Sequence, residues 1–341
     1  MARRPMREKE AIIISGVLGL VILLLASPLW APMIWNTPEA KNPQSVSGGG
    51  LKETDKKKKE KPQKELPVVD ETGVTLKTRI NPPAGYKRIE TEKDGFGEFV
   101  RNYKVKKSTG VVKYWDGRKK KDKDKNIVQA VFKLPLEKED LQRSAGAVIR
   151  MYAEYFWAQG DYDKISFQLI NGFQADFSKW KEGYRIRSGA AGSMWVNGGS
   201  KDDSEENFKK YLHTVLMYTS AASMKKESKK VKEQDIQIGD IFLQDGTSPE
   251  VAMVVDVCEN TQGQKAFLLA KGGKPAQQFY LMKNPASEND PWYYVDGMTY
   301  PLKTADGDFA KRSLRRLPYL EDRQTTTPSG NDFIFLKILK N

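Results

Sequence analysis

Histidine and cysteine are nearly absent from this sequence. Its 341 residues include one of each, His213 and Cys258. A single cysteine excludes an internal disulfide framework, and several His and Cys ligands for zinc cannot be assembled from this inventory. Any Ser/His or Cys/His catalytic pair would have to use His213. His213 stands in a helical apolar pattern and is predicted to be a structural or surface residue. Cys258 follows an apolar strand pattern and is predicted to be a small core residue. We expect no metal and no cofactor.

A concentrated basic surface is also lacking, although the formal net charge is +13. Part of that charge lies in residues 52–64, which include four consecutive lysines, and the remainder is scattered among acidic residues. A lysine run of this kind is typical of a solvated linker. Because no basic stripe is interleaved with aromatic residues, nucleic-acid binding is not expected.

The N-terminal residues carry the pattern of a membrane anchor. Residues 1–10 are basic, and residues 11–35 contain no charge and are mostly apolar. About 20 such residues span a bilayer core as a helix, and the positive-inside rule predicts a cytoplasmic N-terminus with the remainder exported. A cleaved signal peptide is the competing interpretation, and it would export the domain as well. Residues 36–78 are rich in Pro, Gly, Ser, Lys and Glu, which predicts a disordered charged stalk.

The rest of the chain predicts one α+β domain over residues 79–320, followed by an extension over 321–341. Helices are expected over 96–103, 140–157 and 205–219 from apolar residues at three- and four-residue spacing. Strands are expected over 111–115, 129–133, 238–243, 251–257, 265–270, 278–282 and 333–339. A charged hairpin tip is expected over 118–125. Helices that precede an antiparallel sheet favour the α+β class.

Short segments in a fixed order carry a resemblance to a known family. They are 80–86 (INPPAGY), 140–142 (DLQ), 153–155 (AEY), 171–173 (NGF), 179–180 (KW), 183–186 (GYRI), 236–242 (IQIGDIF), 254–256 (VVD), 267–270 (FLLA), 275–277 (PAQ), 283–285 (KNP) and 291–293 (PWY). From about residue 80 to 316 the chain thus resembles domain-of-unknown-function family 4846, a bacterial family.

The resemblance implies a papain-like fold of the NlpC type, with helices packed on an antiparallel sheet. In that arrangement a cysteine opens a helix and a histidine on a facing strand acts as its base. Here Ser144 stands at the expected cysteine and Gly146 at an expected aspartate. Val251 stands at the expected histidine, and Lys271 at an expected glutamine.

These departures predict a catalytically degenerate domain, because a serine hydroxyl is a poor nucleophile without a base and valine cannot act as one. Glu250, beside the base position, is expected to be a solvated turn carboxylate. The sequence therefore favours a pseudoenzyme of the bacterial inner membrane and periplasm, a binding or scaffolding module. Its expected partners are membrane lipid, through the N-terminal helix, and an envelope protein or a peptidoglycan peptide.

Two alternatives stay open. A divergent cell-wall peptide hydrolase or amidase could use Ser144, with Lys271 as base, if the two side chains lie within hydrogen-bonding distance. An accessory subunit of a larger membrane complex is the other alternative.

Overall fold

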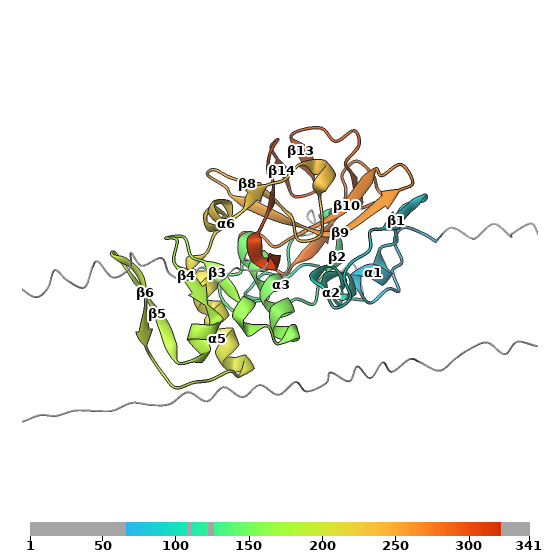
Figure 1. Cartoon of the computed structure of the whole chain (residues 1–341). Coiled ribbons are helices and arrows are strands. Elements are labelled where there is room, and N and C mark those ends of the chain that lie inside the picture. The colour runs from blue at the N-terminus through green and yellow to red at the C-terminus, as the bar shows by residue number, and fades with distance from the viewer. Residues whose placement is uncertain (1–65, 108–110, 122–125, 322–341) are drawn as a thin grey trace, which may run out of the picture. The chain divides into compact units, whose positions relative to one another are not determined.

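The computed structural model describes residues 66–107, 111–121 and 126–321 (Figure 1). The predicted membrane span over 11–35, most of the predicted stalk and the predicted strand over 333–339 lie outside these ranges. Within them, every helix is too short or too polar to be a membrane span.

The described chain alternates helices with short strands. The α-helices are α1 (Leu76–Arg79), α2 (Phe96–Asn102), α3 (Ser144–Gln159), α4 (Phe177–Lys181), α5 (Glu205–Tyr218) and α6 (Ala221–Glu227). Short 3-10 helices are η2 (Tyr162–Lys164), η3 (Glu233–Asp235) and η4 (Pro318–Leu320).

Among the described residues, nine strands form one sheet with antiparallel pairing, in the order β2-β11-β10-β9-β8-β15-β7, with β1 also paired to β9 and β12 to β10. These strands are β1 (Tyr86–Arg88), β2 (Val128–Val131), β7 (Lys229–Lys230), β8 (Ile241–Gln244), β9 (Glu250–Asn260), β10 (Lys265–Lys271), β11 (Tyr280–Met282), β12 (Tyr293–Tyr294) and β15 (Leu314–Arg316). Three hairpins stand apart from it: β3 (Ser166–Gln168) with β4 (Gln174–Asp176), β5 (Tyr184–Gly189) with β6 (Gly192–Asn197), and β13 (Leu302–Thr304) with β14 (Gly307–Phe309). The predicted α+β class with an antiparallel sheet is confirmed.

The central sheet has an apolar cluster on each face. Helix α3 lies against β9 and β10 on one face (Figure 1), where Val251, Met253 and Val255 of β9 pack with α3 residues. The alternate residues Ala252 and Val254 point to the other face, which is shared with the β13–β14 hairpin. Successive side chains of a strand point to opposite faces of a sheet, so neighbouring residues of β9 contact different clusters.

The structure refines several predicted boundaries. The helix predicted over 140–157 begins at Ser144 because residues 139–143 form tight turns, in which the Leu141 amide donates to the Glu139 carbonyl and the Arg143 amide to the Leu141 carbonyl. Residues 111–115 form isolated bridges rather than a strand, and a turn lies at Gly117. Half of the hairpin tip predicted over 118–125 lies outside the described residues. Residues 66–78, assigned above to the stalk, contain α1 and pair with the domain at Val69.

The N-terminal segment is held to the sheet by Asp256 of β9, whose side chain is fully buried. Arg88 of β1 donates from Nε to Oδ2 at 2.7 Å, and Arg101 of α2 donates from Nε to Oδ1 at 2.7 Å. The remaining Arg101 nitrogens donate to the carbonyl oxygens of Ile89 and Val257, at 2.7 and 2.9 Å. Buried ions are tolerated when they are paired and hydrogen-bonded in this way.

Replacing Asp256 by alanine is expected to lower the free energy of unfolding by about 3–5 kcal/mol, because two largely buried guanidinium groups lose their counter-ion. Urea unfolding followed by tryptophan fluorescence measures the change. The control is Asp203→Asn, at an exposed position, which should change it by no more than about 0.5 kcal/mol. Equal effects of the two substitutions would contradict a dependence of the fold on Asp256.

Candidate functional site

Ser144 opens α3, at the position where the resemblance leads us to expect a nucleophile. A helix N-terminus carries a partial positive charge, which favours a thiolate at this position in cysteine enzymes. Ser144 is only 5% exposed. No described residue forms a hydrogen bond with its hydroxyl in the structure, so no base contacts it there.

The loop that follows β10 covers the first turn of α3. A Cβ atom at Gly272 would lie 2.9 Å from the Cβ atom of Ala147 and 3.3 Å from the carbonyl oxygen of Arg143. The amide of Ala276 donates to Asp140 Oδ1 at 2.6 Å, which fastens the loop. Hydrogen bonds from Arg143 and from this amide lower the pKa of Asp140. The start of α3 is therefore closed by backbone that a carboxylate holds in place.

At two further positions where the resemblance leads us to expect catalytic residues, the chain has residues that pack in the core. A Cβ atom at Gly146 would lie 2.9 Å from Leu216 Cδ2 of α5 and 3.2 Å from the Leu141 carbonyl oxygen, so the absence of a side chain lets α5 approach α3. Val251 is fully buried in the apolar cluster on the α3 face of the sheet. Neither residue presents a titratable group to Ser144.

Lys271 lies at the end of β10 and points to the opposite face. Its ammonium group donates to the Asp306 carbonyl oxygen at 2.9 Å and lies 3.0 Å from Glu250 Oε2. The Asp306 carboxylate accepts a hydrogen bond from the Tyr280 hydroxyl and lies 3.3 Å from Lys120 Nζ. Glu250 is thus a partly buried ion-pair partner, not the solvated turn carboxylate that the sequence predicts. The network fastens the β13–β14 turn to the sheet.

Among the described residues, no hydrogen bond or ion pair joins Ser144 to the lone histidine or to the lone cysteine. His213 of α5 is half-buried, with Nδ1 at 3.5 Å from Glu137 Oε2. Cys258 is fully buried within β9, and burial, with a contribution from Asp256, raises the pKa of its thiol. A raised pKa lowers the fraction of reactive thiolate, and Cys258 packs in the core. In the described ranges, no three His, Cys, Asp or Glu residues are grouped as metal ligands.

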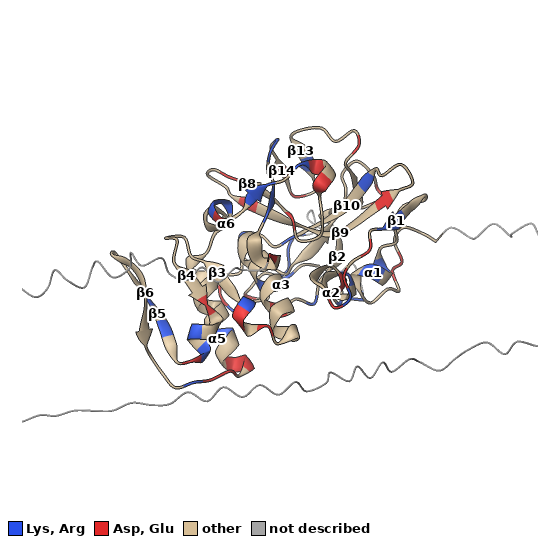
Figure 2. Ribbon diagram, viewed as in Figure 1, with Lys and Arg blue, Asp and Glu red and all other residues tan. Residues whose placement is uncertain are grey.

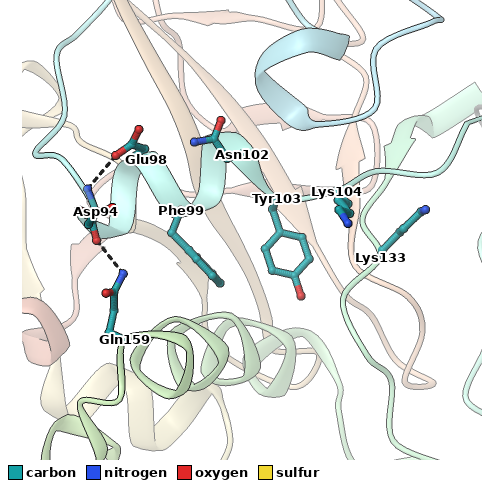
Figure 3. Close-up of a pocket in the computed structure, with 8 residues that line it drawn as sticks. All are labelled: Asp94, Glu98, Phe99, Asn102, Tyr103, Lys104, Lys133 and Gln159. Carbon is teal, nitrogen blue, oxygen red and sulfur yellow. Dashed lines mark hydrogen bonds between the residues drawn. The ribbon is translucent and has the colours of Figure 1, made fainter.

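A cavity of about 500 Å³ lies between α2 and the end of α3. No residue of the first turn of α3 lines it. Its lining residues are Asp94, Glu98, Phe99, Asn102, Tyr103, Lys104, Lys133 and Gln159. Figure 3 shows Asp94 and Glu98 at one end, the Phe99 and Tyr103 rings in the middle, and Lys104 and Lys133 at the other end. Cavities of about 300–1,000 Å³ are typical of small-molecule sites.

The acidic end of this cavity is built around Asp94, whose φ of 59° lies in the left-handed region. Three hydrogen bonds hold this conformation. The Asp94 amide donates to Glu98 Oε2 at 2.7 Å, and the Asp94 carbonyl accepts from Gln159 Nε2 at 2.9 Å and from the Tyr155 hydroxyl at 3.4 Å. Backbone in this region persists where surrounding contacts determine it, as they do at many binding sites.

The lysine end is formed by two adjacent segments. The Lys133 amide donates to the Lys104 carbonyl at 2.8 Å, which brings the two side chains to the same rim. Between the ends, burial raises the pKa of Tyr103, with a smaller contribution from Glu154, so its hydroxyl stays protonated at neutral pH. Figure 2 shows acidic and basic residues otherwise interspersed over the described elements.

Two other cavities lie elsewhere on the domain. One, of about 650 Å³, lies where α2 and α3 meet the segment from Gln237 to Asp240 and the chain after β15. Two of its several charged residues, Asp240 and Arg316, are bonded to each other at 2.7 Å. The second, of about 450 Å³, is lined by Trp180, His213 and neighbouring residues. None of the three cavities is lined by Ser144, Val251 or Lys271.

Comparison with known protein families matches residues 76–316 to the family described as Domain of unknown function (4846). The chain belongs to this family. No curated protein and no solved structure matches the chain. The family 4846 region contains α3, the central sheet and every residue that lines the 500 Å³ cavity.

In this family 4846 protein the ion network at Asp306 predicts a pH-dependent stability. Burial by itself would raise the pKa of Asp306, but Lys271, the Tyr280 hydroxyl and Lys120 together lower it. A lowered native pKa adds stability above the unfolded value of about 3.9, and that stability is lost as the pH falls below it. The difference in unfolding free energy between the parent and Asp306→Asn should therefore shrink between pH 5 and pH 3. Urea unfolding across this interval measures it.

The matched control is Asp308→Asn, which removes an exposed carboxylate from the same hairpin. A difference between the parent and Asp306→Asn that is constant over the whole interval would contradict an ionised, stabilising Asp306.

Proposed function

We propose that this chain is a non-catalytic binding or scaffolding module of the bacterial cell envelope, built on a papain-like fold of the NlpC type. The packing of a long helix against antiparallel strands supports this fold, as does the position of Ser144 at the helix start. The order of the elements, with the helix before strands β8, β9 and β10, also supports it.

One observation carries the non-catalytic part of the proposal. The position expected for the base is Val251, buried in an apolar cluster on the face of the sheet that carries α3. A serine acts as a nucleophile when an adjacent base accepts its proton. A valine side chain cannot accept one, and the covering loop at Gly272 leaves the first turn of α3 closed.

The geometry gives no support to a pair of Ser144 and Lys271. Ala270 packs in the cluster on the α3 face, whereas Lys271, the next residue, contacts Asp306 on the opposite face. Its ammonium group is engaged by the Asp306 carbonyl and by Glu250. A catalytic dyad would need direct hydrogen-bonding distance between the serine hydroxyl and the amine.

Incubation with purified peptidoglycan tests this proposal. New amine and carboxyl termini are quantified by mass spectrometry after incubation with the parent chain, with Ser144→Ala and with buffer. We expect equal, background levels in all three. A product that forms with the parent and is lost in Ser144→Ala would overturn the non-catalytic proposal.

We also propose that residues 11–35 anchor the chain in the inner membrane, with the domain in the periplasm. The uncharged length of this segment and the basic residues before it support that topology. The proposed anchor and stalk would make lipid one partner of the chain and would hold the domain near the cell wall.

Fractionation and a reporter fusion test the proposed topology. The full chain is expected to stay in the membrane pellet after a high-salt wash, and alkaline phosphatase fused to its C-terminus should be active outside the cytoplasm. A chain without residues 1–35 is the matched control and should leave the fusion inactive. A full chain released by salt alone would contradict the anchor.

A further inference from the structure

We infer that the cavity between α2 and the end of α3 binds a short peptide that has both a free amine and a free carboxylate. This inference rests on the proposed binding function and assigns it a place and a ligand class. The amine would lie at Asp94 and Glu98, and the carboxylate at Lys104 and Lys133.

The charges of the cavity are separated and unneutralised. Asp94 and Glu98 lie at one end, and neither carboxylate is within 4.0 Å of a cationic group of the described residues. Lys104 and Lys133 lie at the other end, and neither ammonium group is that close to a described carboxylate. Buried charged groups elsewhere are paired, as Arg101 is with Asp256 and Asp240 is with Arg316. A ligand with opposite charges at its two ends would complement both ends of the cavity at once.

The separation of the two ends fits a peptide of about three residues. The acidic end is at the start of α2 and the lysine end lies just beyond its last residue, Asn102. A helix of this length is on the order of 10 Å long, at 1.5 Å per residue. An extended chain of three residues spans roughly 10 Å at most. A single amino acid is too short to contact both ends.

The middle of the cavity would favour a ligand peptide with an apolar side chain there and a backbone carbonyl that can accept a hydrogen bond. The Phe99 and Tyr103 rings lie next to each other there (Figure 3). Their centroids are 5.4 Å apart and the rings are arranged edge to face. The Tyr103 hydroxyl has no hydrogen-bond partner among the described residues, and it can donate to a peptide carbonyl. Aromatic residues of this kind bury apolar surface and supply one polar group.

Titration calorimetry with the full chain in detergent tests the ligand class. The probe is the tripeptide Ala-Leu-Ala with both termini free, compared with its N-acetylated, C-amidated and doubly blocked forms. We expect saturable binding of the free peptide, and binding about fivefold weaker when either terminus is blocked, which is the effect of losing one exposed ion pair. Equal affinity for the free and doubly blocked peptides, or no saturable binding, would overturn the inference.

Variants locate the two termini of the peptide. Lys104→Gln combined with Lys133→Gln is expected to lower the affinity for the free peptide about fivefold and to leave the affinity for the C-amidated peptide unchanged. Asp94→Asn combined with Glu98→Gln is expected to lower the affinity for the free peptide and to leave the affinity for the N-acetylated peptide unchanged. The control is Lys107→Gln, an exposed lysine outside the cavity, which should leave every affinity unchanged. If neither double variant changes the affinity, the peptide binds elsewhere and the assignment fails.

The same samples separate failure of this inference from failure of the proposed function. Mass spectrometry of the probe after titration reports whether it was cleaved. Cleavage that depends on Ser144 would overturn the non-catalytic proposal while the calorimetry still decides the site. Intact probe without binding would overturn the site and leave the non-catalytic proposal standing.

Discussion

Asp256 is the carboxylate on which the arrangement of the N-terminal half depends. It is fully buried and bonded to two guanidinium groups, one from β1 and one from α2. The excess positive charge is tolerated because carbonyl oxygens accept from the remaining nitrogens. Since Arg101 belongs to α2, this contact also fixes the helix that carries Glu98 and Phe99. The geometry of the 500 Å³ cavity therefore follows from a carboxylate on the central strand of the sheet.

Strand alternation separates two kinds of chemistry on the same sheet. Val251 and Ala270 point to the face that carries α3, where the contacts are apolar. Glu250 and Lys271, each one residue away along its strand, point to the other face and form an ion network with the β13–β14 turn. A shift of one residue would exchange the two sets. The position of Lys271 in its strand thus directs its ammonium group to Glu250 and Asp306, which compensate its charge and connect the β13–β14 turn to the sheet.

The sequence predicts the long apolar elements well and the surface features poorly. Helices α2, α3 and α5 and strands β9 and β10 were predicted to within a few residues at most of their ends, because their apolar spacing extends over enough residues to be unambiguous. The β5–β6 hairpin was missed although Tyr184, Arg185, Ile186 and Arg187 alternate apolar and polar side chains and Gly189 and Gly192 flank a two-residue turn. The alternation extends over only four residues, which is the shortest run that indicates a strand. The cavity was missed for another reason. Asp94, Glu98 and Lys104 lie within one short segment, but Lys133 and Gln159 come from distant parts of the chain, and no local pattern places them beside that segment. Phe99 and Tyr103 at helical spacing predict core residues.

An apolar first turn of α3 and a charged cavity elsewhere are compatible features of one scaffold. Burying a polar catalytic group costs free energy unless it is bonded, and Val251 with the close approach of α5 at Gly146 removes that cost. Binding through hydrated charges at an open rim is weak for each contact, since exposed ion pairs contribute about 0–1 kcal/mol. Weak binding suffices when a tether holds a protein beside many copies of its ligand, because the effective concentration replaces affinity. The proposed membrane anchor would supply that proximity to the peptides of the cell wall, so a non-catalytic domain with a modest site would still be retained there.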